Sequence, residues 1–103
     1  MWSAAVTTFI LLWGVPPFHE AHTGCWYFRC AANRRWGRFW QQHEAARPGH
    51  PALSPGAKAF LERGLVPDPF ERPCAEEMRK DPWLGNSEDV CGDLAAFMAA
   101  NQI

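Results

Sequence analysis

A chain of 103 residues, 48% hydrophobic and 14% aromatic, has room for at most one small domain with a modest core. Residues 1–50 contain five arginines and two glutamates, a net charge of +3, whereas residues 51–103 contain five basic and nine acidic residues, a net charge of −4. Neither half reaches the charge density of a dedicated nucleic-acid-binding protein, so no nucleic acid is expected as a partner.

The segment from Trp2 to Phe18 is apolar and almost uncharged. Gly14, Pro16 and Pro17 interrupt it after about a dozen residues, which is short of a membrane span, and no basic residue precedes it as in a secretory signal. We therefore predict a helix over residues 2–13 that ends at Gly14, and we expect no membrane contact. Because this helix is apolar on every side, we expect other elements to enclose it.

The next stretches carry weaker signals. Residues 19–24 are polar and predict a loop, and residues 26–40 combine six aromatic residues with four arginines. We predict one helix and a following turn for this second stretch. Three prolines and a glycine between Ala45 and Pro55 then predict a loop.

The clearest helix signal begins at Ser54. This serine suits the N-cap, Pro55 suits the first turn, and apolar or small residues recur on one helical face. The residues of that face are Ala57, Phe60, Leu61, Gly64 and Leu65. Pro67 and Pro69 end the helix, with Asp68 in the turn between them.

Two more helices are predicted towards the C-terminus. A short helix covers Pro73 to Lys80 and is followed by a break at Pro82, and a terminal helix begins at Ser87 as its cap. The apolar stripe predicted for the terminal helix consists of Val90, Cys91, Leu94, Phe97 and Met98. No strand signal or internal repeat is present, so the fold class is all-α.

The order of these pieces resembles the end of the eukaryotic protein kinase domain. The segment from Ser54 to Leu61, the turn Asp68-Pro69-x-x-Arg72-Pro73 and the close Pro82-Trp83-Leu84 are similar to helix αH, the turn before helix αI and the final H-P-W signature. Upstream, Trp2-Ser3 and the Gly14-x-Pro16-Pro17-Phe18 turn are similar to helix αF and the turn that leads to αG. The residues that carry the resemblance are Trp2, Gly14, Pro16, Pro17, Phe18, Asp68, Pro69, Arg72, Pro73, Pro82 and Trp83.

The resemblance implies a helical fragment of the kinase C-lobe, αF to αI, of a Ser/Thr kinase in the calmodulin-kinase-like group. Residues 1–85 would form a partial protein kinase domain and residues 86–103 a helical tail after it. The family transfers the γ-phosphate of ATP to protein Ser or Thr with magnesium. The chain contains no G-x-G-x-x-G, H-R-D or D-F-G, so no catalytic, cofactor-binding or metal-binding residue is assigned, and the start is expected to reflect a truncation.

Further expectations follow from that resemblance. The chain alone should be inactive, with ATP and magnesium needed only by a full-length parent. Its partners would be the remainder of a kinase domain or a protein substrate surface, in the cytoplasm. Because most elements around the first helix would be missing, we also expect marginal stability and an exposed apolar patch.

Three residues are expected to differ from the family in their contacts. The partner of Arg72 in the family is the glutamate of A-P-E, which lies before αF, so we expect Arg72 to turn to solvent. Cys74 stands where the family has Ser or Thr, which half removes the capping box formed with Glu77. Asp81 replaces the family's histidine before Pro82 and removes a ring donor.

Other readings of the sequence are open. The four cysteines and the apolar start also fit a small secreted, disulfide-stabilised protein with residues 1–18 as a signal segment. A zinc site at His19, His22, Cys25 and Cys30 has suitable ligand types, but the spacing matches no strong template and unrelated surface residues are favoured. For the arginines and aromatics of residues 26–40, core formation is favoured over base stacking.

Overall fold

The computed structural model describes residues 2–101, apart from the side chains of Ser87, Ala100 and Asn101. This part of the chain forms seven helices and no strand, which confirms the predicted all-α class. The helices are α1 (Trp2–Trp13), α2 (Trp26–Ala32), α3 (Trp36–Ala46), α4 (Pro55–Gly64), α5 (Ala75–Arg79), α6 (Pro82–Gly85) and α7 (Ser87–Asn101).

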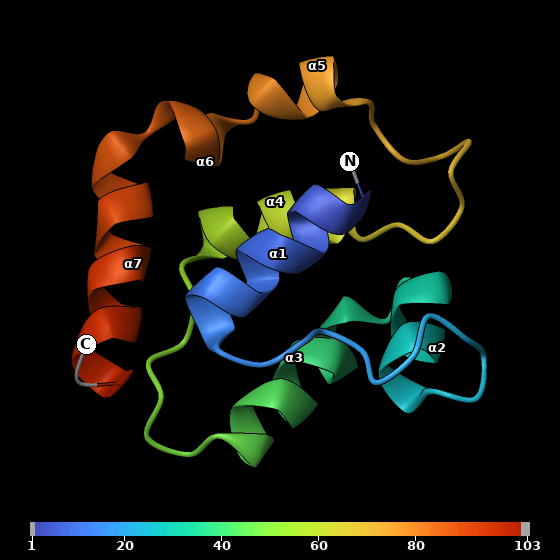
Figure 1. Ribbon diagram of the computed structural model, residues 1–103, viewed down its shortest axis with the longest axis horizontal. Coiled ribbons are helices and arrows are strands. Elements are labelled where there is room, and N and C mark those ends of the chain that lie inside the picture. The colour runs from blue at the N-terminus through green and yellow to red at the C-terminus, as the bar shows by residue number, and fades with distance from the viewer. Residues whose placement is uncertain (1, 102–103) are drawn as a thin grey trace.

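Helices α1 and α4 contact each other at the centre of the molecule (Figure 1). Helices α2 and α3 form a pair on one side, and the short helices α5 and α6 lie on the other. Helix α7 runs along a third edge, where it contacts α1, α4 and α6. The chain thus surrounds α1 on some sides and leaves the rest of it open.

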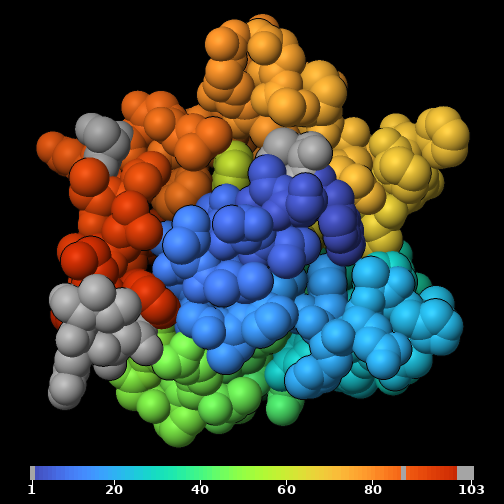
Figure 2. Space-filling view, viewed as in Figure 1, coloured from blue at the N-terminus to red at the C-terminus, as the bar shows by residue number. Residues whose placement is uncertain are grey.

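Helix α1 has the predicted bounds but is not enclosed. Its inner face, which includes Phe9 and Trp13, is fully buried. On the outer face, Ile10 is 39% exposed and Leu11 is 58% exposed. Figure 2 shows α1 uncovered on this side of the molecule. The prediction of full enclosure is therefore wrong, whereas the exposed apolar surface that was expected around this helix is present.

The stretch 26–40 forms parts of two helices, where one helix and a turn were predicted. Arg34 adopts the left-handed conformation with φ 56°, directly after Asn33, the C-cap of α2. The N–H of Arg35 then donates to the carbonyl of Cys30 at 2.8 Å, and the N–H of Arg34 donates to that of Ala31 at 3.2 Å. This is a helix-ending motif usually built on glycine, so an arginine gave no sequence signal for it. Helix α3 continues to Ala46, slightly into the predicted loop.

Helix α4 follows its sequence signals closely. The Ser54 Oγ accepts a hydrogen bond from the Ala57 N–H at 3.2 Å, and Pro55 occupies the first turn. All five residues of the predicted face are buried. Burial of this face against α1 and α7 fixes α4 at the centre of the fold.

The C-terminal helices depart from the prediction in three ways. Pro82 begins the short helix α6 instead of only breaking the chain. The predicted Ser87 cap involves a side chain outside the described residues, whereas Asn86 Oδ1 accepts from the Asp89 N–H at 3.2 Å. The inner face of α7 contains the buried Asp93 between two half-buried apolar residues, and three residues of the predicted stripe are exposed instead. Those three are Cys91, Leu94 and Met98.

Candidate functional site

Three residues of the kinase-like motif, from separate segments, meet at the start of α1. The ring of Trp2 stacks on Phe18, with 5.6 Å between ring centroids and 13° between planes. The guanidinium carbon of Arg72 lies 4.7 Å from the centroid of the same Trp2 ring, which is a cation–π contact. The turn after α1 and the turn before α5 are thus both attached to Trp2.

Arg72 does not turn to solvent as expected. Its Nε donates to the Val66 carbonyl at 2.8 Å, and an Nη donates to the Pro67 carbonyl at 3.0 Å. Both carbonyls lie in the turn that follows α4, beyond its C-cap Leu65. The planar guanidinium therefore holds this turn against the Trp2 ring through two carbonyls of the chain itself.

Asp81 gains a role in place of the family's histidine. It is buried, and its Oδ2 accepts from Arg63 Nη1 at 2.6 Å. Its Oδ1 accepts from the Trp83 N–H at 2.9 Å, which caps α6. One carboxylate thus joins α4 to the Pro82-Trp83 signature.

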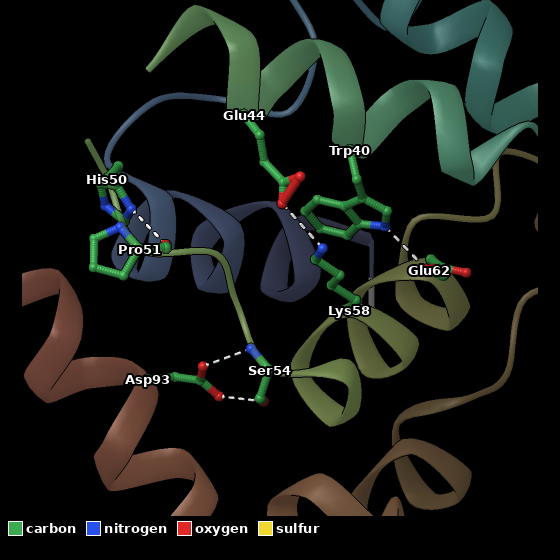
Figure 3. Close-up of polar contacts among 8 residues, drawn as sticks. All are labelled: Trp40, Glu44, His50, Pro51, Ser54, Lys58, Glu62 and Asp93. Carbon is green, nitrogen blue, oxygen red and sulfur yellow. Dashed lines mark hydrogen bonds and ion pairs between the residues drawn. The ribbon is translucent and has the colours of Figure 1, made fainter. Parts of the chain in front are cut away.

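A second buried carboxylate, Asp93 of α7, joins the start of α4 to Trp83. Figure 3 shows its two contacts with Ser54. Its Oδ1 accepts from the Ser54 N–H at 2.9 Å, and its Oδ2 accepts from the Ser54 hydroxyl at 2.7 Å. The same Oδ2 accepts from Trp83 Nε1 at 2.9 Å. Three donors converge on one charged group, and hydrogen bonds to charged groups are the stronger kind. We call Ser54, Trp83 and Asp93 the Asp93 cluster.

Polar contacts also connect α3 to α4 (Figure 3). Trp40 Nε1 donates to Glu62 Oε2 at 2.9 Å. The Lys58 ammonium pairs with Glu44 Oε2 at 3.0 Å and lies 5.6 Å from the centroid of a Trp40 ring. These contacts hold α3 against α4.

His43 lies buried under the turn after α1. Its Nε2 is 3.0 Å from the carbonyl of Pro17, and its ring stacks on Tyr27 with 4.0 Å between centroids. Burial lowers the pKa of His43 from its ordinary 6.5 to about 4, although the Pro17 carbonyl opposes the shift. At pH 7 the ring is therefore neutral and donates its Nε2 proton to Pro17.

Gly14 is required by its backbone. Its φ is +94°, and a Cβ at this position would clash with Nη1 of Arg47. That guanidinium donates to the Trp13 carbonyl at the end of α1. The remaining motif residues shape turns: Asp68 Oδ1 accepts from the Phe70 N–H at 2.9 Å, and four prolines flank the turns or the helix starts. Those prolines are Pro16, Pro69, Pro73 and Pro82.

The structure does not bring together the residues of the zinc site or of the disulfides that the sequence left open. Among the described residues no group of three or more His, Cys, Asp or Glu is placed to hold a metal ion, so the zinc hypothesis gains no support. All four cysteines are free thiols. Both arms of the capping box between Cys74 and Glu77 are present, so the expected half loss is wrong; the Cys74 N–H donates to Glu77 Oε1 at 3.4 Å. No helix in residues 2–101 is long and apolar enough to cross a membrane.

Comparison with known proteins gives matches among kinases. The chain is 30% identical over 95 residues to a probable myosin light chain kinase of Dictyostelium discoideum, covering 92% of the chain and 25% of that protein. It is 40% identical over 85 residues to calcium-dependent protein kinase 10 of Oryza sativa subsp. japonica, covering 82% of the chain and 13% of that protein. It is 28% identical over 109 residues to a calcium/calmodulin-dependent protein kinase of Emericella nidulans, covering the whole chain and 24% of that protein.

These matches identify the class. The chain is a homologue of the C-terminal part of the eukaryotic Ser/Thr protein kinase domain. Two of the three relatives quoted are named as calcium-dependent or calcium/calmodulin-dependent kinases. The chain spans a quarter or less of the length of each of the three. No family model and no solved structure matches the chain. The matches give no support to the secreted alternative.

Sequence reasoning missed the two buried carboxylates and their partners. Asp93 interrupts an apolar spacing on α7, between Val90 and Phe97. A polar residue at a core-facing position indicates a buried hydrogen-bond partner, so this signal was readable. The Arg63 to Asp81 pair spans 18 residues and left no local pattern.

Proposed function

We propose that the chain is the non-catalytic helical scaffold of a Ser/Thr kinase C-lobe and transfers no phosphate by itself. The observation that carries this proposal is that the residues of the kinase-like motif contact other residues of this chain. Trp2 contacts both Phe18 and Arg72, and Trp83 donates to the carboxylates of Asp81 and Asp93. Their polar atoms bond to turn carbonyls and to carboxylates of this chain, which leaves them with structural roles.

The chemistry of phosphoryl transfer supports the same conclusion. Transfer requires a lysine and a phosphate-covering loop for ATP, acidic residues for magnesium, and a catalytic aspartate. The sequence holds none of the motifs that supply these groups, and the described residues offer no acidic cluster for a metal. ATP and magnesium would then belong to the rest of a kinase domain, and residues 86–103 would be the tail that follows it.

The open face of α1 is the proposed contact with that remainder. Ile10, Leu11 and Val15 are exposed apolar residues near the centre of one side, where water contact is unfavourable. Joining the remainder of the domain would cover them. The four free thiols suit a reducing compartment, so the proposed location is the cytoplasm.

A chimera tests the scaffold role. The segment of the rice calcium-dependent relative that matches this chain is replaced by the chain, and phosphorylation of a peptide substrate is measured. We expect activity from the chimera and none from the relative with the segment deleted. Leu11→Asp in the chimera should lower activity because it places a charge in the covered face, whereas Leu84→Asp, at an exposed residue of α6, should not.

The chain alone is the second arm of this test. With labelled ATP and magnesium, phosphate transfer to a protein substrate should equal the blank. Transfer that rises in proportion to the concentration of the chain, and that persists after repeated purification, would overturn the proposal of a non-catalytic role.

A further inference from the structure

A small pocket with an unusual charge lies at the junction of α2 and α3. It has a volume of about 140 Å³ and is lined by Trp26, Arg29, Cys30, Asn33, Arg35 and Arg38. We call it the α2–α3 basic pocket. Three of the six lining residues carry a positive charge and none carries a negative charge.

The three arginines lack the carboxylate partner that four other cations of the described residues have. Arg34, Lys58, Arg63 and Arg79 each pair with a carboxylate. Within the described residues, no carboxylate lies within ion-pair distance of Arg29, Arg35 or Arg38, and Arg29 donates only to the carbonyl of Thr23 at 2.8 Å. Like charges held close together repel, and an anion between them would relieve that repulsion.

Cys30 also lines the pocket, and the three arginines act on the pKa of its thiol. Cys30 is buried, and burial is the main cause that raises its pKa. The guanidiniums of Arg38, Arg35 and Arg29 all act against that shift and lower the pKa of the thiol. All three positive charges therefore favour the anionic form of this thiol, which agrees with a positive potential in the pocket.

The start of α3 adds to the positive potential. Arg35 is the N-cap of α3, no side chain caps this end, and the first turn contains no acidic residue. The N-terminal end of an 11-residue helix carries a partial positive charge and N–H groups without partners inside the helix. Arg35 and Arg38 of this turn line the pocket, so helix and side chains favour the same kind of ligand.

We propose that the α2–α3 basic pocket binds the phosphate group of a phosphorylated serine or threonine on a partner protein. Guanidinium groups match phosphate oxygens with paired hydrogen bonds, and a pocket of about 140 Å³ holds one such group. Trp26 lines the pocket and is 41% exposed, which offers an apolar surface to the residue beside the phosphorylated one. A long polyanion fits less well, because residues 51–103 carry a net charge of −4.

Binding is tested on the whole 103-residue chain with a short fluorescent peptide that contains phosphoserine next to leucine. At pH 7.5 the phosphate is mostly a dianion, since its second pKa is about 6. We expect saturable binding by fluorescence polarisation, at least tenfold weaker binding of the unphosphorylated peptide, and competition by inorganic phosphate. Raising the salt concentration should weaken binding.

Matched variants locate the site. Arg38→Gln and Arg35→Gln should each weaken binding about tenfold or more, as expected for one lost hydrogen bond to a charged group. Arg34→Gln removes the same charge from the same turn, but its guanidinium pairs with Glu71 at 2.7 Å outside this pocket, so affinity should be nearly unchanged. Circular dichroism of each variant checks that the helices are retained.

The other outcomes count against the proposal. The proposal would be overturned if the two peptides bind equally or if inorganic phosphate does not compete. It would also be overturned if Arg34→Gln loses as much affinity as Arg35→Gln and Arg38→Gln. Tighter binding of a single-stranded oligonucleotide than of the phosphopeptide would assign the arginines to nucleic acid instead. The peptide and competition arms use the unaltered chain, so the proposal stays testable even if a variant fails to fold, and none of them depends on kinase activity.

Discussion

Replacing Asp93 with asparagine should destabilise the fold, although the two side chains have nearly the same shape. The carboxylate accepts from the Ser54 N–H on one oxygen and from the Ser54 hydroxyl and Trp83 Nε1 on the other. An amide has a single oxygen. If the amide oxygen of the asparagine faces the Ser54 N–H, the amide NH₂ faces the Trp83 Nε1–H. If the oxygen faces Trp83 instead, the NH₂ faces the Ser54 N–H. Either orientation sets two donors against each other.

One buried donor without an acceptor costs about 1–3 kcal/mol, and the loss of the negative charge weakens the remaining bonds. We therefore expect the free energy of unfolding to fall by about 2–3 kcal/mol. Urea denaturation followed by circular dichroism would show this as a midpoint lowered by about 1–2 M. Asp89→Asn is the matched control, because Asp89 is exposed on the same helix and should change stability by less than about 1 kcal/mol.

A double mutant isolates the conflict between donors. Trp83→Phe removes the indole N–H, so the asparagine can turn its oxygen to the Ser54 N–H without opposing an indole donor. Asp93→Asn should then cost at least about 1 kcal/mol less in the Trp83→Phe variant than in the natural chain. Equal costs in the two backgrounds, or a single-variant loss below about 1 kcal/mol, would refute this account of the Asp93 cluster.

Three further predictions concern the residues around α1. Because the pKa of His43 in the folded chain is about 4 and its ordinary value is 6.5, the unfolded chain binds more protons between these values. Stability should fall as pH drops through this range, by about 3 kcal/mol at most, and His43→Gln should flatten the slope between pH 6.5 and 5. Arg72→Lys should cost about 1–2 kcal/mol in urea denaturation, since an ammonium lacks the planar fork that reaches two carbonyls and stacks on a ring; a loss no larger than in Arg79→Lys would argue against this. Gly14→Ala should cost about 1–2 kcal/mol because of its φ of +94°, whereas Gly37→Ala, with open space around it, should be neutral or stabilising, and equal thermal shifts would contradict this reasoning.

Local signals predicted much of the fold. The bounds of α1 follow from Gly14 and the prolines after it, and α4 follows from its cap and its apolar face. These features act within a few residues, so they are readable in sequence. The break between α2 and α3 was missed because Arg34 takes a backbone conformation that normally requires glycine.

The long-range contacts were not readable in the same way. The family pattern marked Arg72 as a residue that needs partners, but the carbonyls and the ring that it contacts depend on how α1 and α4 cross. The apolar pattern of α7 predicted a stripe and hid Asp93, whose partner Ser54 lies 39 residues away in the chain. Contacts of this kind are set by tertiary structure, which local patterns do not encode.

The Asp93 cluster also bears on where this folding unit ends. The kinase-like motif closes at Trp83 and Leu84, and a boundary drawn from it would fall near Gly85. The carboxylate that joins Ser54, at the start of α4, to Trp83 lies beyond that point, on α7. A chain shortened at Gly85 would keep every motif residue, yet Trp83 Nε1 and the Ser54 N–H would lose their acceptor. Recognition of the motif and stability of the fold therefore require different end points, and protein prepared for study should extend through α7.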